Sequence, residues 1–326
     1  MRRNDRRLDL AARAAWLYYV AGNRQDEIAE KLNVSRQAVQ RLVSLAVSEK
    51  LIKFRLDHPI AECVALGEEL RARYGLVYCS VQPSASGVGH PNVGVAIAAA
   101  EHLATYLAEK EPLVIAFSTG QMLRAVADEM PAMSCPQHKL VSLVGSISRD
   151  GQAGSYEVVR RIAERVGAPC FPIPTPVVAS SVEERRLLQT QRSFAVVRDL
   201  AAQAAVAFVG VGHIGWQAPL HRDHFVTDQE IAELIEQGAV GEIAGWAYDS
   251  AGRFVDSDVN DRNAAVPLQE LGRTRMIGVS GSLERVIAIG AALRGGLLHG
   301  LITDEHSAAA VLRASKRLDS GLRAIG

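Results

Sequence analysis

Residues 25–42 read QDEIAEKLNVSRQAVQRL, and this stretch decides the fold of the N-terminal part of the chain. Its apolar residues lie four apart in the first half and three apart in the second, a spacing that places each pair on one face of a short helix. Asn33 occupies the turn between these helices, where a left-handed backbone is expected and Asn tolerates it better than most residues. Ser35 follows as an N-cap. The stretch therefore predicts a helix-turn-helix with the apolar core positions Ile28, Leu32, Val34, Val39 and Leu42.

The polar positions of this motif carry hydroxyl, amide and guanidinium groups, which bind phosphates and the edges of bases. We predict a DNA-binding surface formed by Gln25, Ser35, Arg36, Gln37, Gln40 and Arg41. An apolar helix over residues 8–20 would complete the small core. Residues 51–56 alternate apolar and polar side chains, which predicts a strand that would make the unit winged.

Charge is distributed unevenly, although the 326-residue chain as a whole has no formal net charge. Residues 1–55 hold twelve basic and six acidic residues, whereas the rest of the chain holds 24 basic and 30 acidic ones. This asymmetry favours a basic nucleic-acid-binding domain over residues 1–57 joined to a larger acidic domain over residues 58–326. The alternative on charge alone is an N-terminal helix with a solvated basic face.

The composition indicates a cytoplasmic protein, because no apolar stretch approaches the roughly 18 residues of a membrane span and no apolar segment follows the basic start. The four cysteines stand far apart without a CxxC pair, so we expect core residues and neither a disulfide framework nor a zinc site. These cysteines are Cys63, Cys79, Cys135 and Cys170. We expect no bound metal and no cofactor.

After Pro59 the chain alternates short β-branched runs with amphipathic stretches, which predicts an α/β domain with a doubly wound, mostly parallel sheet. The expected strands cover residues 76–81, 113–117, 139–143, 207–211, 243–248 and 276–279. The expected helices cover residues 60–74, 94–108, 121–130, 155–166, 182–196, 228–237 and 284–293. Ligands bind such sheets at the carboxyl ends of the strands, so the loops that follow the strands are the candidate site.

Two of these loops could hold an anion. Ser118, Thr119 and Gly120 lead from a strand into a helix, whose first N–H groups attract anions; the alternative is an ordinary capped turn. Arg285 lies just after another strand, where it could reach a ligand or pair with a surface carboxylate. The glycine-rich residues 209–215 lack the acidic partner of a dinucleotide-binding loop.

Several segments together resemble the SorC/DeoR-type sugar-responsive transcriptional regulators of bacteria. They are residues 15–19 and 25–42, then 118–120, 144–146, 211–215, 245–252, 292–296 and 301–305. The resemblance implies a body with the fold of ribose-5-phosphate isomerase and glucosamine-6-phosphate deaminase, used to sense a sugar, sugar phosphate or sugar alcohol. It also implies a homotetramer that binds operators near genes for catabolism of the effector.

The residues also depart from the family pattern. The family often has Gly-Thr-Thr or Gly-Thr-Ser where this chain has Phe117-Ser118-Thr119, and a Lys where it has Arg285. A phosphorylated effector held by Arg285 and a neutral polyol held by hydroxyl-matching groups both stay open. The predicted effector site consists of Ser118, Thr119, Gly120, Gln152, Asp249 and Arg285.

Taken together, these residues and the resemblance predict a transcriptional regulator of a carbohydrate or polyol catabolic operon, controlled by an effector that binds the C-terminal domain. The alternative is a sugar-phosphate isomerase or deaminase that carries a DNA-binding domain. Such an enzyme needs a paired acid and base. Asp249 and Asp304 have ordinary interpretations as a hydroxyl acceptor and a helix cap, so we expect no enzymatic activity. A single helix-turn-helix binds half a site, which predicts a homo-oligomer, a dimer or tetramer, on palindromic operator DNA, with no membrane partner.

Overall fold

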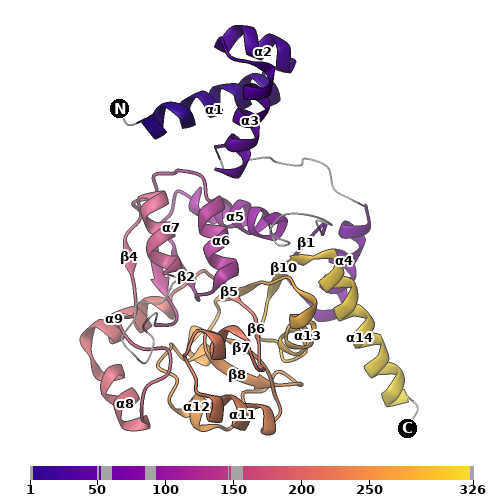
Figure 1. Cartoon of the computed structure of the whole chain (residues 1–326). Coiled ribbons are helices and arrows are strands. Elements are labelled where there is room, and N and C mark those ends of the chain that lie inside the picture. Colours follow the sequence, from indigo (N-terminus) through magenta and orange to yellow (C-terminus); the bar gives the residue numbers. More distant parts are fainter. Residues whose placement is uncertain are drawn as a thin grey trace. The chain divides into compact units, whose positions relative to one another are not determined.

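The computed structural model describes residues 3–49, 51–52, 61–84, 93–145, 147 and 157–323 (Figure 1). The chain divides into two compact units, residues 1–58 and 59–326. Within the described residues, no helix is both long and apolar enough to cross a membrane.

The N-terminal unit is built from three helices, α1 (Arg3–Tyr19), α2 (Gln25–Leu32) and α3 (Arg36–Ser48). Ile28 and Val39 are completely buried between them. Asn33 has a left-handed backbone with φ of 52°, and the Ser35 hydroxyl accepts the backbone N–H of Ala38 at 3.2 Å. The predicted helix-turn-helix is confirmed. Residues 53–56 of the predicted wing lie outside the described residues.

The second unit contains a parallel sheet, which has seven strands in the described part of the chain. In spatial order the strands are β1 (Tyr78–Gln82), β10 (Gly300–Asp304), β9 (Arg275–Val279), β5 (Val206–Gly210), β2 (Val114–Phe117), β3 (Lys139–Ser142) and β4 (Cys170–Phe171). Every neighbouring pair is parallel. The predicted mostly parallel sheet is confirmed.

Helices cover both faces of this sheet, because successive residues of each strand point to opposite sides. Ile115 and Phe117 of β2 pack into one apolar layer with α5 (Val93–Leu107), α6 (Gln121–Glu129) and α7 (Val158–Val166). Ala116 belongs to the other layer, together with residues of several further helices. They include α4 (Ala61–Tyr74), α9 (Arg192–Ala201), α13 (Val286–Arg294) and α14 (Glu305–Arg323).

The predicted strand over residues 243–248 is wrong. Ala244 and Gly245 have φ of 53° and 79°, and two successive positive values make a tight turn. This turn joins β7 (Ala239–Ile243) to β8 (Trp246–Asp249) in a separate antiparallel sheet that also contains β6 (Gly212–His213).

The predicted helix over residues 182–196 is two helices, α8 (Val182–Thr190) and α9. Gln191 between them has an extended backbone, which ends the first helix. The sequence reasoning also missed β4 and β10 as strands and α14 as a helix. The remaining short elements are α10 (Pro219–Arg222), α11 (Asp228–Glu236), α12 (Asp258–Asp261), η1 (Leu268–Leu271) and η2 (Leu283–Arg285).

Candidate functional site

A cavity of about 720 Å³, partly open to solvent, lies at the carboxyl ends of β2, β5 and β9. Its polar lining comes from loops that are far apart in the sequence. The polar side chains are those of Thr119, Gln121, Asp223, Glu242 and Arg285, and Gly120 also lines the cavity. Its apolar lining includes Met122, Val144, Val177, Leu220 and Phe225. The position is the one expected for a ligand site in a parallel sheet.

The N-terminus of α6 forms one side of the cavity. Gly120 precedes the helix with φ of 128° and supplies no side-chain cap to its first turn. The first N–H groups of a helix have no partner within the helix and carry partial positive charge, which suits an anion. Ser118 precedes this turn in the sequence, and its hydroxyl accepts the backbone N–H of Gly210 at 3.0 Å. Ser118 therefore fixes the loops of β2 and β5 together instead of lining this cavity.

Arg285 reaches the cavity from the end of η2. Its Nε is buried and has no hydrogen-bond partner among the described residues. Burial lowers the pKa of Arg285, while the nearby carboxylates of Glu242 and Glu284 raise it. An arginine in this position remains charged, and a buried donor without a partner is costly. The side chain is thus suited to an anionic or strongly accepting ligand.

Glu242 is the principal cavity residue that the sequence reasoning missed. Its Oε2 accepts the backbone N–H of Gly245 at 2.8 Å, at the turn that joins β7 to β8. Burial raises the pKa of Glu242, and that hydrogen bond and Arg285 oppose the rise. The carboxylate packs against Gly212, where a Cβ would lie 2.1 Å from Oε1. Glycine at 212 therefore makes room for this carboxylate.

Two more polar side chains close to the cavity were missed. Asp223 lines it and pairs with Arg222, with 3.0 Å between Nε and Oδ1. His213 lies next to Gly212 with a buried Nδ1 that has no partner among the described residues. Burial lowers the pKa of His213, and the charge of Arg285 adds to this.

The structure separates Asp249 from the other predicted effector residues. Its Oδ1 accepts the backbone N–H groups of Ala251 and Arg253 at 2.9 and 3.0 Å, and its Oδ2 pairs with the Arg253 guanidinium at 2.9 Å. These contacts lower the pKa of Asp249. Asp249 ends β8, which belongs to the antiparallel sheet, and it is not among the described residues that line the cavity. Gln152 lies outside the described residues.

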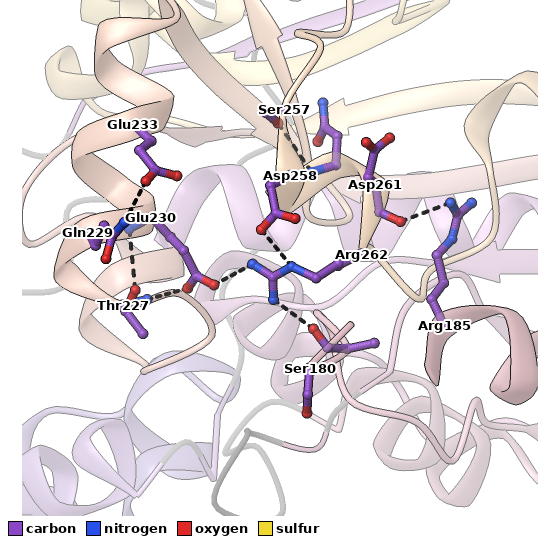
Figure 2. A network of polar contacts seen from close by, with 12 residues as sticks. Ser180, Arg185, Thr227, Gln229, Glu230, Glu233, Ser257, Asp258, Asp261 and Arg262 are labelled. Atoms are coloured by element: carbon purple, nitrogen blue, oxygen red, sulfur yellow. Dashed lines mark hydrogen bonds and ion pairs between the residues drawn. The ribbon is translucent and has the colours of Figure 1, made fainter. Parts of the chain in front are cut away.

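A buried polar network holds one wall of the cavity in place (Figure 2). Arg262 donates hydrogen bonds to Glu230 of α11, to Asp258 at 2.8 Å and to the carbonyl of Ala179 at 2.7 Å. The next residue, Asn263, donates its side-chain amide to the carbonyl of Ala244, which lines the cavity, at 3.3 Å. The network thus joins α11, α12 and the segment before α8 behind the β7–β8 turn.

In the N-terminal unit, the predicted DNA-contacting side chains share one exposed face at the start of α3. Arg36, Gln37, Gln40 and Arg41 are all exposed, and they follow the period of the helix. Arg36 lies 3.4 Å from Asp26 of α2 in an exposed ion pair. Gln25 is half-buried at the start of α2.

Comparison with known proteins identifies the family. Residues 58–313 match the family described as "Putative sugar-binding domain". Over 93% of its length the chain is 33% identical to the erythritol catabolism regulatory protein EryD of Brucella abortus, of which it covers 96%. It is 30% identical, over 93% of its length, to the deoxyribonucleoside regulator of Bacillus subtilis, of which it covers 97%.

The chain belongs to this family of transcriptional regulators with a sugar-binding domain. The resemblance to SorC/DeoR-type regulators is thereby confirmed. The full-length sorbitol operon regulator SorC of Klebsiella pneumoniae shares the fold, with a TM-score of 0.69, 22% identity, and coverage of 94% of this chain and 99% of SorC. A DeoR-family regulator of Listeria monocytogenes matches 76% of this chain and 99% of its own, with a TM-score of 0.69 and 19% identity.

Proposed function

We propose that the cavity is the effector site and that its ligand is a phosphorylated sugar or sugar alcohol. The observation that carries this proposal is the buried Arg285 Nε without a partner, in a cavity that also contains the N-terminus of α6. A phosphate offers acceptors to both, since a guanidinium and a row of backbone N–H groups each bind phosphate oxygens well.

The carboxylates of the cavity are suited to the hydroxyl groups of the ligand. Glu242 and Asp223 can accept hydrogen bonds from the hydroxyl groups of the sugar or sugar alcohol. The names of the relatives refer to erythritol, deoxyribonucleosides and sorbitol, which supports a sugar or sugar alcohol as the carbon skeleton of the ligand.

The remaining parts of the proposal concern DNA and assembly. Residues 1–57 act as the DNA-binding domain, with Gln25, Ser35, Arg36, Gln37, Gln40 and Arg41 on the operator, and residues 58–326 bind the effector and pair the chains. A dimer or tetramer on a palindromic operator follows from the need to occupy two half-sites. Light scattering at micromolar concentration tests this part, and a monomer with full operator affinity would contradict it.

Ligand binding is tested by thermal shift and calorimetry on the full chain. The ligands are erythritol, erythritol 4-phosphate, 2-deoxyribose 5-phosphate, sorbitol 6-phosphate and inorganic phosphate. We expect a phosphorylated compound to raise Tm, since binding to the native state stabilises it. Arg285→Ala should weaken that ligand by about 1.5 to 3 kcal/mol, the range for a hydrogen bond to a charged group.

The matched control is Arg273→Ala, which removes an exposed arginine just before β9 and should leave affinity unchanged. Tight binding of a neutral polyol that is insensitive to Arg285→Ala would refute the phosphate proposal.

A further inference from the structure

The loop that carries Arg285 is held by a chain of hydrogen bonds outside the cavity. Ser282 donates its backbone N–H to the Ser307 hydroxyl at 3.0 Å, and its own carbonyl accepts the N–H of Arg285 at 3.0 Å. Ser307 lies on α14 and is completely buried. Its hydroxyl donates to Asp304 Oδ2 at 2.6 Å, and its backbone N–H donates to Oδ1 at 2.9 Å. The Ser307 hydroxyl is bonded both as donor and as acceptor, so its orientation is fixed.

The same end of α14 is bonded to α4. Glu305 Oε2 accepts the thiol of Cys63, on α4, at 3.7 Å. Burial and the charge of Glu305 raise the pKa of Cys63 to about 11, so the thiol keeps its proton and remains a donor. Glu305 Oε1 accepts the backbone N–H of Ser84 at 2.9 Å, and the Ser84 hydroxyl donates to Asp304 at 3.2 Å. The start of α14 is therefore bonded through Asp304 to Ser307 and Ser84, and through Glu305 to Cys63 and Ser84.

Helix α4 lies beside residues 305–316 of α14 (Figure 1). Lys316 and Glu69 form an ion pair at 2.8 Å, and Arg73 donates to the Ser315 hydroxyl. An ion pair and a hydrogen bond thus join α14 to α4. In the sequence, α4 is the first described helix of the second unit.

We propose that Asp304, Glu305 and Ser307 are positioning residues that couple the Arg285 loop to α4, and that they pass the state of the cavity to the start of the second unit. The proposal rests on the proposed function in taking Arg285 as the residue that contacts the effector. A ligand that binds Arg285 fixes η2, and Ser282 then fixes Ser307 and the first turn of α14. Glu305 conveys the change to Cys63. Coupling of this kind is reciprocal, so a change at the α4 end must also reach the loop.

Hydrogen exchange of the full chain, measured by mass spectrometry without ligand, tests the coupling in both directions. Ser307→Ala removes the acceptor of the Ser282 N–H, and Glu305→Gln weakens the contact with Cys63. We expect Ser307→Ala to speed exchange in residues 61–74 by at least roughly three- to tenfold, because one lost hydrogen bond has about this effect on local opening and this variant loses both the bond from Ser282 and the bond to Asp304. Glu305→Gln should speed exchange in residues 280–286 by a similar factor.

Ser181→Ala is the matched control. The Ser181 hydroxyl accepts the N–H of Glu184 at 3.1 Å at the start of α8, so the variant loses the same kind of bond elsewhere and should change α8 alone. Rates are compared with those of α7, so that a general loss of stability is recognised. Acceleration by Ser307→Ala that stays within residues 280–310, or that is equal in α7 and α4, would overturn the coupling.

A second measurement separates the coupling from the proposed function, with erythritol 4-phosphate as the probe. In the wild-type chain the compound should slow exchange in both residues 280–286 and residues 61–74, whereas in Ser307→Ala it should slow the former alone. No protection of residues 280–286 in the wild-type chain would count against the proposed function, and the ligand-free exchange would still decide the coupling. Protection of residues 280–286 without protection of α4 in the wild-type chain would refute the coupling itself.

Discussion

Arg262→Met removes the centre of the buried network in Figure 2, and its cost can be worked out from the structure. The side chains of Arg262 and Glu230 are 5% and 12% exposed, so the substitution leaves the Glu230 carboxylate out of water and without its cation. Breaking a buried pair by removing one partner typically costs about 3 to 5 kcal/mol. For a unit of this size such a loss lowers Tm by roughly 6 to 20 °C.

The assay is urea unfolding of the full chain, monitored by circular dichroism. Arg253→Met is the matched control, because Arg253 also pairs with a carboxylate in the same region, but its side chain is 80% exposed. Exposed pairs contribute about 0 to 1 kcal/mol, so the control should unfold close to the wild type.

A double variant identifies the cause of the loss. Arg262→Met with Glu230→Gln removes the unpaired charge, while the amide oxygen can still accept the N–H of Thr227 that Glu230 accepts at 2.7 Å. If the buried charge is the cause, the double variant recovers much of the stability. Unfolding of Arg262→Met at the same urea concentration as Arg253→Met would refute the reasoning, since the network would then contribute no more than a surface pair.

Three further predictions concern other parts of the molecule. Gln37→Ala should weaken operator binding by about 1 to 3 kcal/mol and affect random DNA little, as expected for a base contact; equal losses in a gel-shift assay would contradict this role. Gly212→Ala should displace the Glu242 carboxylate and weaken ligand binding more than stability, because the new Cβ meets the end of a flexible side chain; unchanged ligand affinity would contradict this. His102 stacks on Tyr78 with 3.7 Å between ring centroids, and burial lowers its pKa below 6.5. The unfolded chain therefore binds a proton more readily, so the stability of the wild type relative to His102→Phe should fall as pH drops below about 6.5; a pH-independent difference in urea unfolding would contradict this.

The helix-turn-helix could be predicted from the sequence because its determinants are local. The left-handed Asn33, the cap at Ser35 and the apolar spacing all lie within eighteen consecutive residues. The parallel sheet was predictable for a similar reason, since its strands are short apolar runs separated by amphipathic helices. β10 was missed because Gly300–Asp304 follows a glycine-rich segment and runs directly into α14, so its pairing with β1 and β9 is visible only in three dimensions.

The effector site was predictable to the extent that it follows from the parallel sheet. Thr119, Gly120 and Arg285 come from loops after parallel strands, and the structure brings them to one cavity. Asp249 was placed there on the assumption that residues 243–248 form a strand of the same sheet. The positive φ values at Ala244 and Gly245 break that assumption, because they turn the chain back into a hairpin.

The same hairpin explains why Glu242 escaped notice. A lone glutamate in a half-polar strand is ordinarily a solvated side chain, and only the β7–β8 turn and its packing against Gly212 place this carboxylate in the cavity. The Glu242 carboxylate accepts one backbone N–H and occupies the space that a Cβ at position 212 would need, and an acceptor held in this way near Arg285 can discriminate between ligands by the direction of their hydroxyl groups. Glu242→Gln should therefore change which phosphorylated compound binds best, while Arg285→Ala should weaken all of them alike. Calorimetry on both variants with the same set of compounds separates the two roles, and a uniform loss in Glu242→Gln would show that this residue contributes charge without selectivity.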